Sequence, residues 1–87
     1  MKYEIFFTKQ GKKDFKEMIN GIYARKLAEL ICILENNPYQ NPPPYEKKIG
    51  SEREYSRRIN IVHRLDYEIL DGHKIKIISC MTHYHDN

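Results

Sequence analysis

The stretch SRRINIVHRLDYEI, residues 56–69, decides the fold because polar and apolar side chains alternate along it. At a period of two, one face of an extended chain carries the apolar set Ile59, Ile61, Leu65, Tyr67 and Ile69. The other face carries the polar set Arg58, Asn60, Arg64, Asp66 and Glu68. A strand or hairpin with this pattern buries the first set and exposes the second. Arg58 and Arg64 are therefore expected to point outward together from a rigid sheet, an arrangement that suits a phosphate ligand.

The segments around this stretch predict the remaining elements. We expect strands at 2–7, 54–61, 63–70 and 74–82, and helices at 9–19 and from about 21 to 36. The second helix carries an apolar stripe at helical spacing, formed by Leu27, Leu30, Ile31 and Leu34. Thr8 and Asn20 are suitable N-caps for the two helices, and Asp71-Gly72 is a suitable hairpin turn. The order β-α-α-β-β-β predicts an α+β domain, in which a two-helix hairpin packs on a mainly antiparallel, twisted sheet.

Composition limits the class of protein. With 87 residues, the chain is expected to form one domain, residues 1–87. Its net charge of +3 favours a nucleic-acid partner only weakly. Cys32 and Cys80 lie in apolar segments and are expected in the core. No long apolar run or signal peptide is visible, so we expect a cytoplasmic protein with no membrane association.

A proline-rich segment precedes the predicted sheet. Pro38 and the run Pro42–Pro44 exclude a helix and favour a stiff, extended connection. Two interpretations are open for this segment. It is either a connection that crosses the molecule or a loop that presents Tyr45 and Glu46 at an exposed place.

Several residues together fit the cleavage of RNA through its 2′-hydroxyl. This reaction needs a base for the hydroxyl proton, an acid for the departing 5′-oxygen, and positive charge beside the phosphorane. Glu46 fits the base, His83 the acid, and Arg64 with Arg58 the charge clamp. Tyr84 fits a group that stacks on a base or orients the phosphate. These roles require no metal and no cofactor, and no Cys/His spacing resembles a zinc site.

Each of these residues also has an ordinary structural interpretation. A Glu that follows prolines is usually solvated, and strand arginines often pair with nearby carboxylates, here Asp66 and Glu68. In a regular strand His83 and Tyr84 point to opposite faces, so they act on one substrate only where the strand frays or twists.

The motifs YSRRIN (55–60), HRLDY (63–67), SCMTHY (79–84) and PYEK (44–47) together resemble the YoeB/Txe family. These proteins are toxins of bacterial toxin–antitoxin modules within the RelE-like group of small ribonucleases. The resemblance spans nearly the whole chain and follows the same order of elements. It implies an endoribonuclease that cuts mRNA on translating ribosomes at the A-site codon.

The resemblance also implies roles for individual residues. Glu46 corresponds to the general base, Arg64 to the group that stabilises the phosphate, and Arg58 to its assistant. His83 and Tyr84 correspond to the general acid and the substrate-positioning residue. The further residues expected to contact RNA are Arg57, Lys47 and Lys48. The expected partners are mRNA on the ribosome, a cognate antitoxin and, in a homodimer, a second copy of the chain.

Alternatives to these assignments are open. The chain is one residue shorter than the family pattern between Glu46 and Tyr55, and an ungapped alignment puts Tyr45 in place of Glu46. His85 competes with His83 as the acid. The alternative functions are a non-catalytic inhibitor of the gyrase-blocking type on the same scaffold and a general RNA-binding module.

Overall fold

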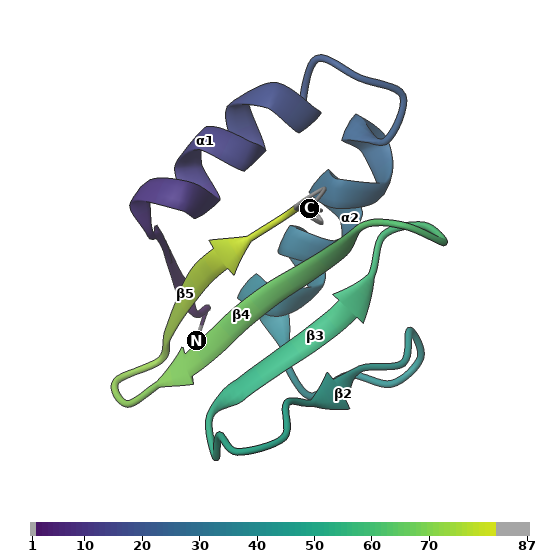
Figure 1. Ribbon diagram of the computed structural model, residues 1–87. Helices are drawn as coiled ribbons and strands as arrows, with labels where there is room; N and C mark the ends of the chain where they lie inside the picture. Colours follow the sequence, from purple (N-terminus) through teal and green to yellow (C-terminus); the bar gives the residue numbers. More distant parts are fainter. Residues whose placement is uncertain (1, 82–87) are drawn as a thin grey trace.

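Two helices and a five-stranded mixed sheet make up the computed structural model, which describes residues 2–81 (Figure 1). The elements are β1 (Glu4–Phe7), α1 (Lys9–Met18), α2 (Ala24–Asn36), β2 (Glu46–Lys47), β3 (Glu54–Arg58), β4 (Arg64–Leu70) and β5 (Lys74–Ser79). The strand order is β1-β5-β4-β3-β2. Only β1 and β5 pair in parallel among these strands, so the sheet is mainly antiparallel, as predicted. The predicted α+β class is confirmed.

The core lies between the helices and one face of the sheet. Leu27, Leu30 and Leu34 of α2 are buried, as their helical spacing predicts. The strands contribute Leu65, Tyr67, Ile69, Ile75 and Ile77, all buried, to the same cluster. In β4 these residues alternate with half-buried polar ones, so the period-two pattern is confirmed there. The polar side chains of β4 consequently lie on the face turned away from the helices.

The connection between β3 and β4 differs from the prediction. The expected strands 54–61 and 63–70 end at Arg58 and begin at Arg64, and Ile61 is 90% exposed instead of buried. Asn60 causes the difference, because its side-chain oxygen accepts hydrogen bonds from the backbone N–H groups of Val62 and His63. Such a bond stabilises a turn and competes with strand pairing.

The other boundaries are close to those predicted, but three further predictions are wrong. Asn20 does not cap α2, whose N-cap residue is Tyr23. The short strand β2 lies within the segment expected to be a loop, because two residues are too few to show a period. Cys32 is exposed, whereas Cys80 is buried as expected. Within residues 2–81, neither helix has the length and apolar character needed to cross a bilayer.

Gly11 allows α1 to lie directly against β5. Thr8 caps the helix, accepting from the Gly11 N–H at 2.9 Å, and its hydroxyl donates to the Ile78 carbonyl at 2.8 Å. A Cβ atom at Gly11 would overlap the backbone carbonyl oxygen of Ile77. Only a residue without a side chain fits at this contact.

Gly11→Ala should therefore lower the free energy of unfolding by about 1–3 kcal/mol, the usual cost of overpacking. The gain of about 1 kcal/mol in helix propensity does not compensate, since the clash is with backbone. Urea unfolding followed by circular dichroism measures the change. Gly21→Ala is the control, because its new Cβ would lie 3.5 Å from the nearest atom, the Met18 oxygen, in ordinary contact. Equal stabilities for the two variants would contradict the prediction.

The two cysteines should differ in reactivity. Burial raises the pKa of the Cys80 thiol to about 12, and the carboxylates of Asp14 and Asp66 add to the rise. Because the thiolate is the reactive form, a disulfide reagent at pH 8 should modify exposed Cys32 quickly and Cys80 only after unfolding. Mass spectrometry of native and urea-treated protein measures the two sites. Equal labelling of both cysteines in the native protein would refute this prediction.

Candidate active site

A row of polar residues crosses the sheet on the face turned away from the helices. Glu46 of β2 pairs with Ser56 of β3, Ser56 pairs with Asp66 of β4, and Asp66 pairs with Ser79 of β5. Directly paired residues of antiparallel strands share a face and lie about 5 Å apart. The row therefore gathers residues from the middle and the end of the chain into one site.

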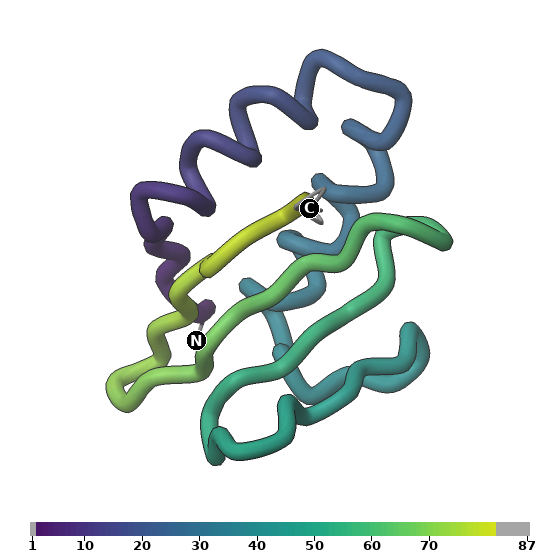
Figure 2. The backbone as a smooth tube through the Cα atoms, viewed as in Figure 1, coloured from purple at the N-terminus to yellow at the C-terminus, as the bar shows by residue number. Residues whose placement is uncertain are grey.

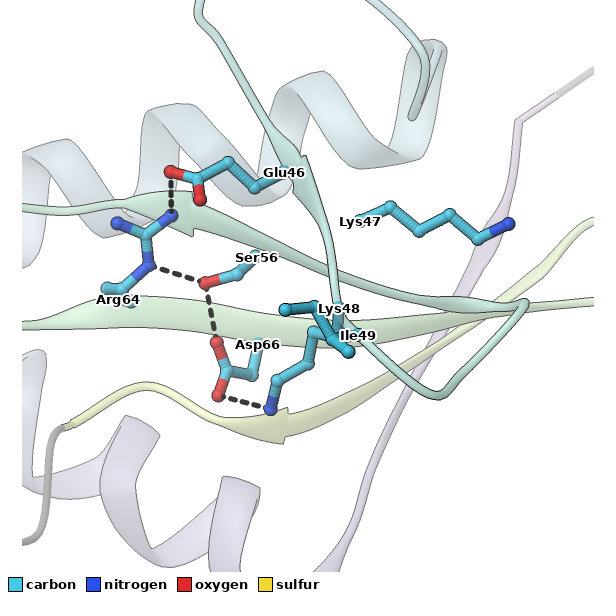
Figure 3. A pocket seen from close by; sticks show the side chains of 7 residues that line it. All are labelled: Glu46, Lys47, Lys48, Ile49, Ser56, Arg64 and Asp66. Atoms are coloured by element: carbon cyan, nitrogen blue, oxygen red, sulfur yellow. Dashed lines mark hydrogen bonds and ion pairs between the residues drawn. The ribbon is translucent and has the colours of Figure 1, made fainter.

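Glu46 and Arg64 form the centre of this site (Figure 3). Arg64 Nη2 donates to Glu46 Oε1 at 3.1 Å. The Glu46 side chain is 73% exposed and the Arg64 side chain 32%, so both reach solvent while in contact. Arg58 pairs with Arg64 across the strands, which brings a second guanidinium to the same face.

A chain of hydrogen bonds holds Arg64 from behind. Its Nε donates to Ser56 Oγ at 2.7 Å, and Ser56 Oγ donates to Asp66 Oδ1 at 2.7 Å. Lys48 Nζ lies 3.1 Å from the other Asp66 oxygen, and the Ser79 hydroxyl donates to that oxygen at 3.4 Å. These contacts fix one edge of the guanidinium and leave the Nη edge facing Glu46 and solvent (Figure 3).

Two adjoining hollows meet at the Glu46–Arg64 pair. The larger, of about 340 Å³, is lined by Glu46, Lys47, Lys48, Ile49, Ser56, Arg64 and Asp66. The smaller, of about 230 Å³, is lined by Pro44, Glu46, Arg58 and Arg64. A group bound where they meet would face a carboxylate able to accept a proton and guanidiniums able to bind an anion. The Lys47 side chain extends away from the hydrogen-bonded network (Figure 3).

Arg57 does not belong to this surface, so the prediction that it contacts RNA is wrong. Its side chain is fully buried on the core side of the sheet. Its guanidinium donates to the Tyr67 hydroxyl at 3.1 Å. It also donates to the backbone carbonyls of Pro43 (2.6 Å), Pro38 (2.8 Å) and Gln40 (2.9 Å). Four of its five N–H groups thus donate to these partners, and the buried guanidinium is out of reach of a phosphate.

The Arg57 contacts explain how the proline-rich segment serves the site. Residues 38–43 are held against β3, and the chain then enters β2 at Glu46. The Tyr45 ring packs edge-on against Tyr55 at 5.7 Å and lies 4.9 Å from the Arg57 guanidinium. The segment is thus both a connection and a support that presents Glu46, rather than Tyr45, to Arg64.

The structure brings together part of the set predicted from the sequence. Glu46 and Arg64 line both hollows, Lys47 and Lys48 line the larger, and Arg58 lines the smaller. His83, Tyr84 and His85 lie outside the described residues, so their roles remain predictions. The predictions missed Ser56, which contacts Arg64 directly, and the indirect role of Asp66 behind it. Both residues could be found only from the register between β3 and β4, which the sequence of a single strand does not reveal.

Comparison with known proteins identifies the family. No family model and no curated protein sequence matches this chain. Among solved structures, the YoeB dimer from Staphylococcus aureus is 32% identical, with a TM-score of 0.79, over 97% of this chain and 100% of that one. A heterotetrameric YoeB–YefM toxin–antitoxin complex from the same organism gives 35% identity over 97% of this chain and 100% of that one, with a TM-score of 0.75.

The chain belongs to the YoeB family of toxins. A YoeB/ParE toxin from Agrobacterium tumefaciens shares the fold, with a TM-score of 0.81 and 24% identity over 93% of this chain and 99% of that one. The resemblance drawn from the SRRI and HRL motifs is confirmed, and the helices and mixed sheet form the RelE-like fold of these YoeB-family toxins.

Proposed function

We propose that this YoeB-family chain is the endoribonuclease toxin of a toxin–antitoxin module and cuts mRNA at the ribosomal A site. The observation that carries the proposal is the contact between Glu46 and Arg64 at 3.1 Å, at the meeting point of two hollows. A proton acceptor and a phosphate-binding cation are thereby held within reach of one phosphodiester.

In the proposed reaction, Glu46 removes the proton of the 2′-hydroxyl, and the 2′-oxygen attacks the adjacent phosphorus. The new bond to phosphorus forms as the bond to the 5′-oxygen breaks. The products are a 2′,3′-cyclic phosphate and a free 5′-hydroxyl. Arg64 and Arg58 balance the charge that develops on the phosphorane oxygens. We assign proton donation to the 5′-oxygen to His83 and positioning of the substrate to Tyr84.

The contacts of Arg64 support these roles for Arg64 and Glu46. Its Nε is bound to Ser56, so the guanidinium keeps its place when the Nη2 bond to Glu46 is exchanged for one to phosphate. Glu46 is mostly exposed and can then accept the hydroxyl proton without losing a buried partner. Lys48, and Lys47 beside it, add positive charge to the wall along which RNA would lie.

The proposed partners follow from the relatives. The Staphylococcus aureus YoeB structures are a dimer and a complex with YefM. We propose that this chain likewise pairs with a cognate antitoxin and forms homodimers. Because the proposed substrate is mRNA on the ribosome, we place its activity in the cytoplasm.

Expression of the chain without an antitoxin tests the proposed function. Growth arrest with cuts inside coding frames, mapped by primer extension, is the expected result. The purified protein should make the same cuts on translating ribosomes and few on naked RNA. Arrest with signs of DNA damage and intact mRNA would overturn the proposal in favour of a gyrase-type inhibitor. Tight RNA binding without toxicity would overturn it in favour of an RNA-binding module.

A further inference from the structure

Asp66 lies in the middle of the hydrogen-bonded network but bonds neither to Glu46 nor to the Nη edge of Arg64. Its side chain is only 22% exposed. Both of its oxygens are bound within the protein, one by Ser56 and the other by Lys48 and Ser79. Because both oxygens already accept hydrogen bonds from the protein, Asp66 is poorly suited to contact the substrate itself.

The chemistry of the groups fixes the direction of the bonds between Asp66 and Arg64. Arg64 Nε is only a donor, and an ionised carboxylate is only an acceptor. The Ser56 hydroxyl between them must therefore give its single hydrogen to Asp66 and accept the Arg64 N–H with a lone pair. Without the carboxylate, that hydrogen is free to rotate toward Arg64 and disrupt the contact.

We propose that Asp66 is a positioning residue for the reaction. Acting through the Ser56 hydroxyl, it holds the Arg64 guanidinium edge-on beside Glu46, and its other oxygen holds Lys48 on the wall of the larger hollow. The inference rests on the proposed function, since it assumes that Arg64 meets the scissile phosphate.

Glu68 provides a matched control. It is on the same strand and face as Asp66, and it is similarly exposed, at 25%. It forms an ordinary ion pair with Lys76 at 3.2 Å and lines neither hollow. Loss of Glu68 removes a carboxylate of the same kind without touching the Arg64 network.

The kinetic test compares Asp66→Ala, Ser56→Ala, their double variant, Asp66→Asn and Glu68→Ala on mRNA in translating ribosomes. Both single alanine variants should lower kcat by roughly 10-fold to 100-fold with little change in KM, since a misdirected group slows the chemical step. The double variant should lose no more than Asp66→Ala alone, because the Ser56 hydroxyl acts in series with Asp66. Asp66→Asn keeps an acceptor for the Ser56 hydroxyl and should recover most of the activity. Glu68→Ala should match the wild type.

An NMR measurement tests the same inference without relying on cleavage. The Nε–H proton of Arg64, assigned by its loss in Arg64→Lys, should exchange slowly in the wild type and in Glu68→Ala. It should exchange faster in Asp66→Ala and Ser56→Ala. A wild type that does not cut mRNA but shows this protection would refute the proposed function alone. Equal kcat and equal exchange in Asp66→Ala and Glu68→Ala, or additive losses in the double variant, would overturn the positioning role.

Discussion

Replacement of Arg64 by lysine is expected to reduce mRNA cleavage by about 10²-fold or more while the protein stays folded. A guanidinium binds Ser56 through Nε and presents its Nη edge to phosphate at the same time. A lysine ammonium is a compact charge that cannot bind Ser56 and a phosphate in this fixed geometry at the same time. Single-turnover cleavage of mRNA on ribosomes measures the loss, and circular dichroism shows that the fold is kept.

Arg53→Lys is the control for this prediction. Arg53 lies near the other end of the β3–β4 hairpin, where it pairs at 3.5 Å with Asp71, whose side chain is 95% exposed. Such a surface pair contributes little to stability, and neither residue lines a hollow. Arg53→Lys should cleave like the wild type. An Arg64→Lys enzyme within a few-fold of the wild type would show that charge alone suffices and that the edge-on arrangement is unimportant.

The second large effect concerns stability. Arg57→Met should lower the free energy of unfolding by roughly 3–5 kcal/mol, because each buried acceptor left without its donor costs about 1–3 kcal/mol and part of that cost is relieved by relaxation. The substitution keeps an apolar stem of similar length but leaves three backbone carbonyls and the Tyr67 hydroxyl without their donor. That loss is a large fraction of the free energy of unfolding of a typical domain, which is roughly 5–15 kcal/mol. Chemical denaturation measures it.

Arg58→Met is the matched control, since the same substitution is made one residue along the strand. Arg58 is exposed on the opposite face, so its loss should change the free energy of unfolding by no more than about 0.5 kcal/mol. Only the stabilities of the two variants are compared, because Arg58 lines the smaller hollow and its loss should also reduce cleavage. Equal stability of the two variants would show that the Arg57 contacts contribute nothing net to folding.

The sequence predicts the fold well where one period extends over a whole element. The stripe Leu27, Leu30 and Leu34 and the alternation of β4 are both found as expected. The pattern fails at residues 59–63, where the Asn60 side chain makes a turn and Ile61 leaves the core face. Arg57, expected among the residues that contact RNA, lies instead on the apolar face, where its cross-strand partner is Leu65.

The site is less predictable because it depends on register between strands. Glu46, Arg58 and Arg64 were recognisable from chemistry and motif, but nothing in a single strand places Ser56 opposite both Glu46 and Asp66. Arg57 was misassigned because a buried guanidinium needs carbonyl partners, and these come from a loop 14 to 19 residues away in sequence. The roles of His83 and Tyr84 remain predictions.

The parallel pairing of β1 with β5 has a consequence for biosynthesis. Within residues 2–81, the first strand lies beside the last, as Figure 2 shows, and the Thr8 hydroxyl donates to the carbonyl of Ile78, 70 residues further along. The sheet therefore cannot be completed on a growing polypeptide until β5 has left the exit tunnel. A nuclease proposed to attack translated messages thus lacks its complete sheet for as long as β5 stays inside the ribosome that makes it.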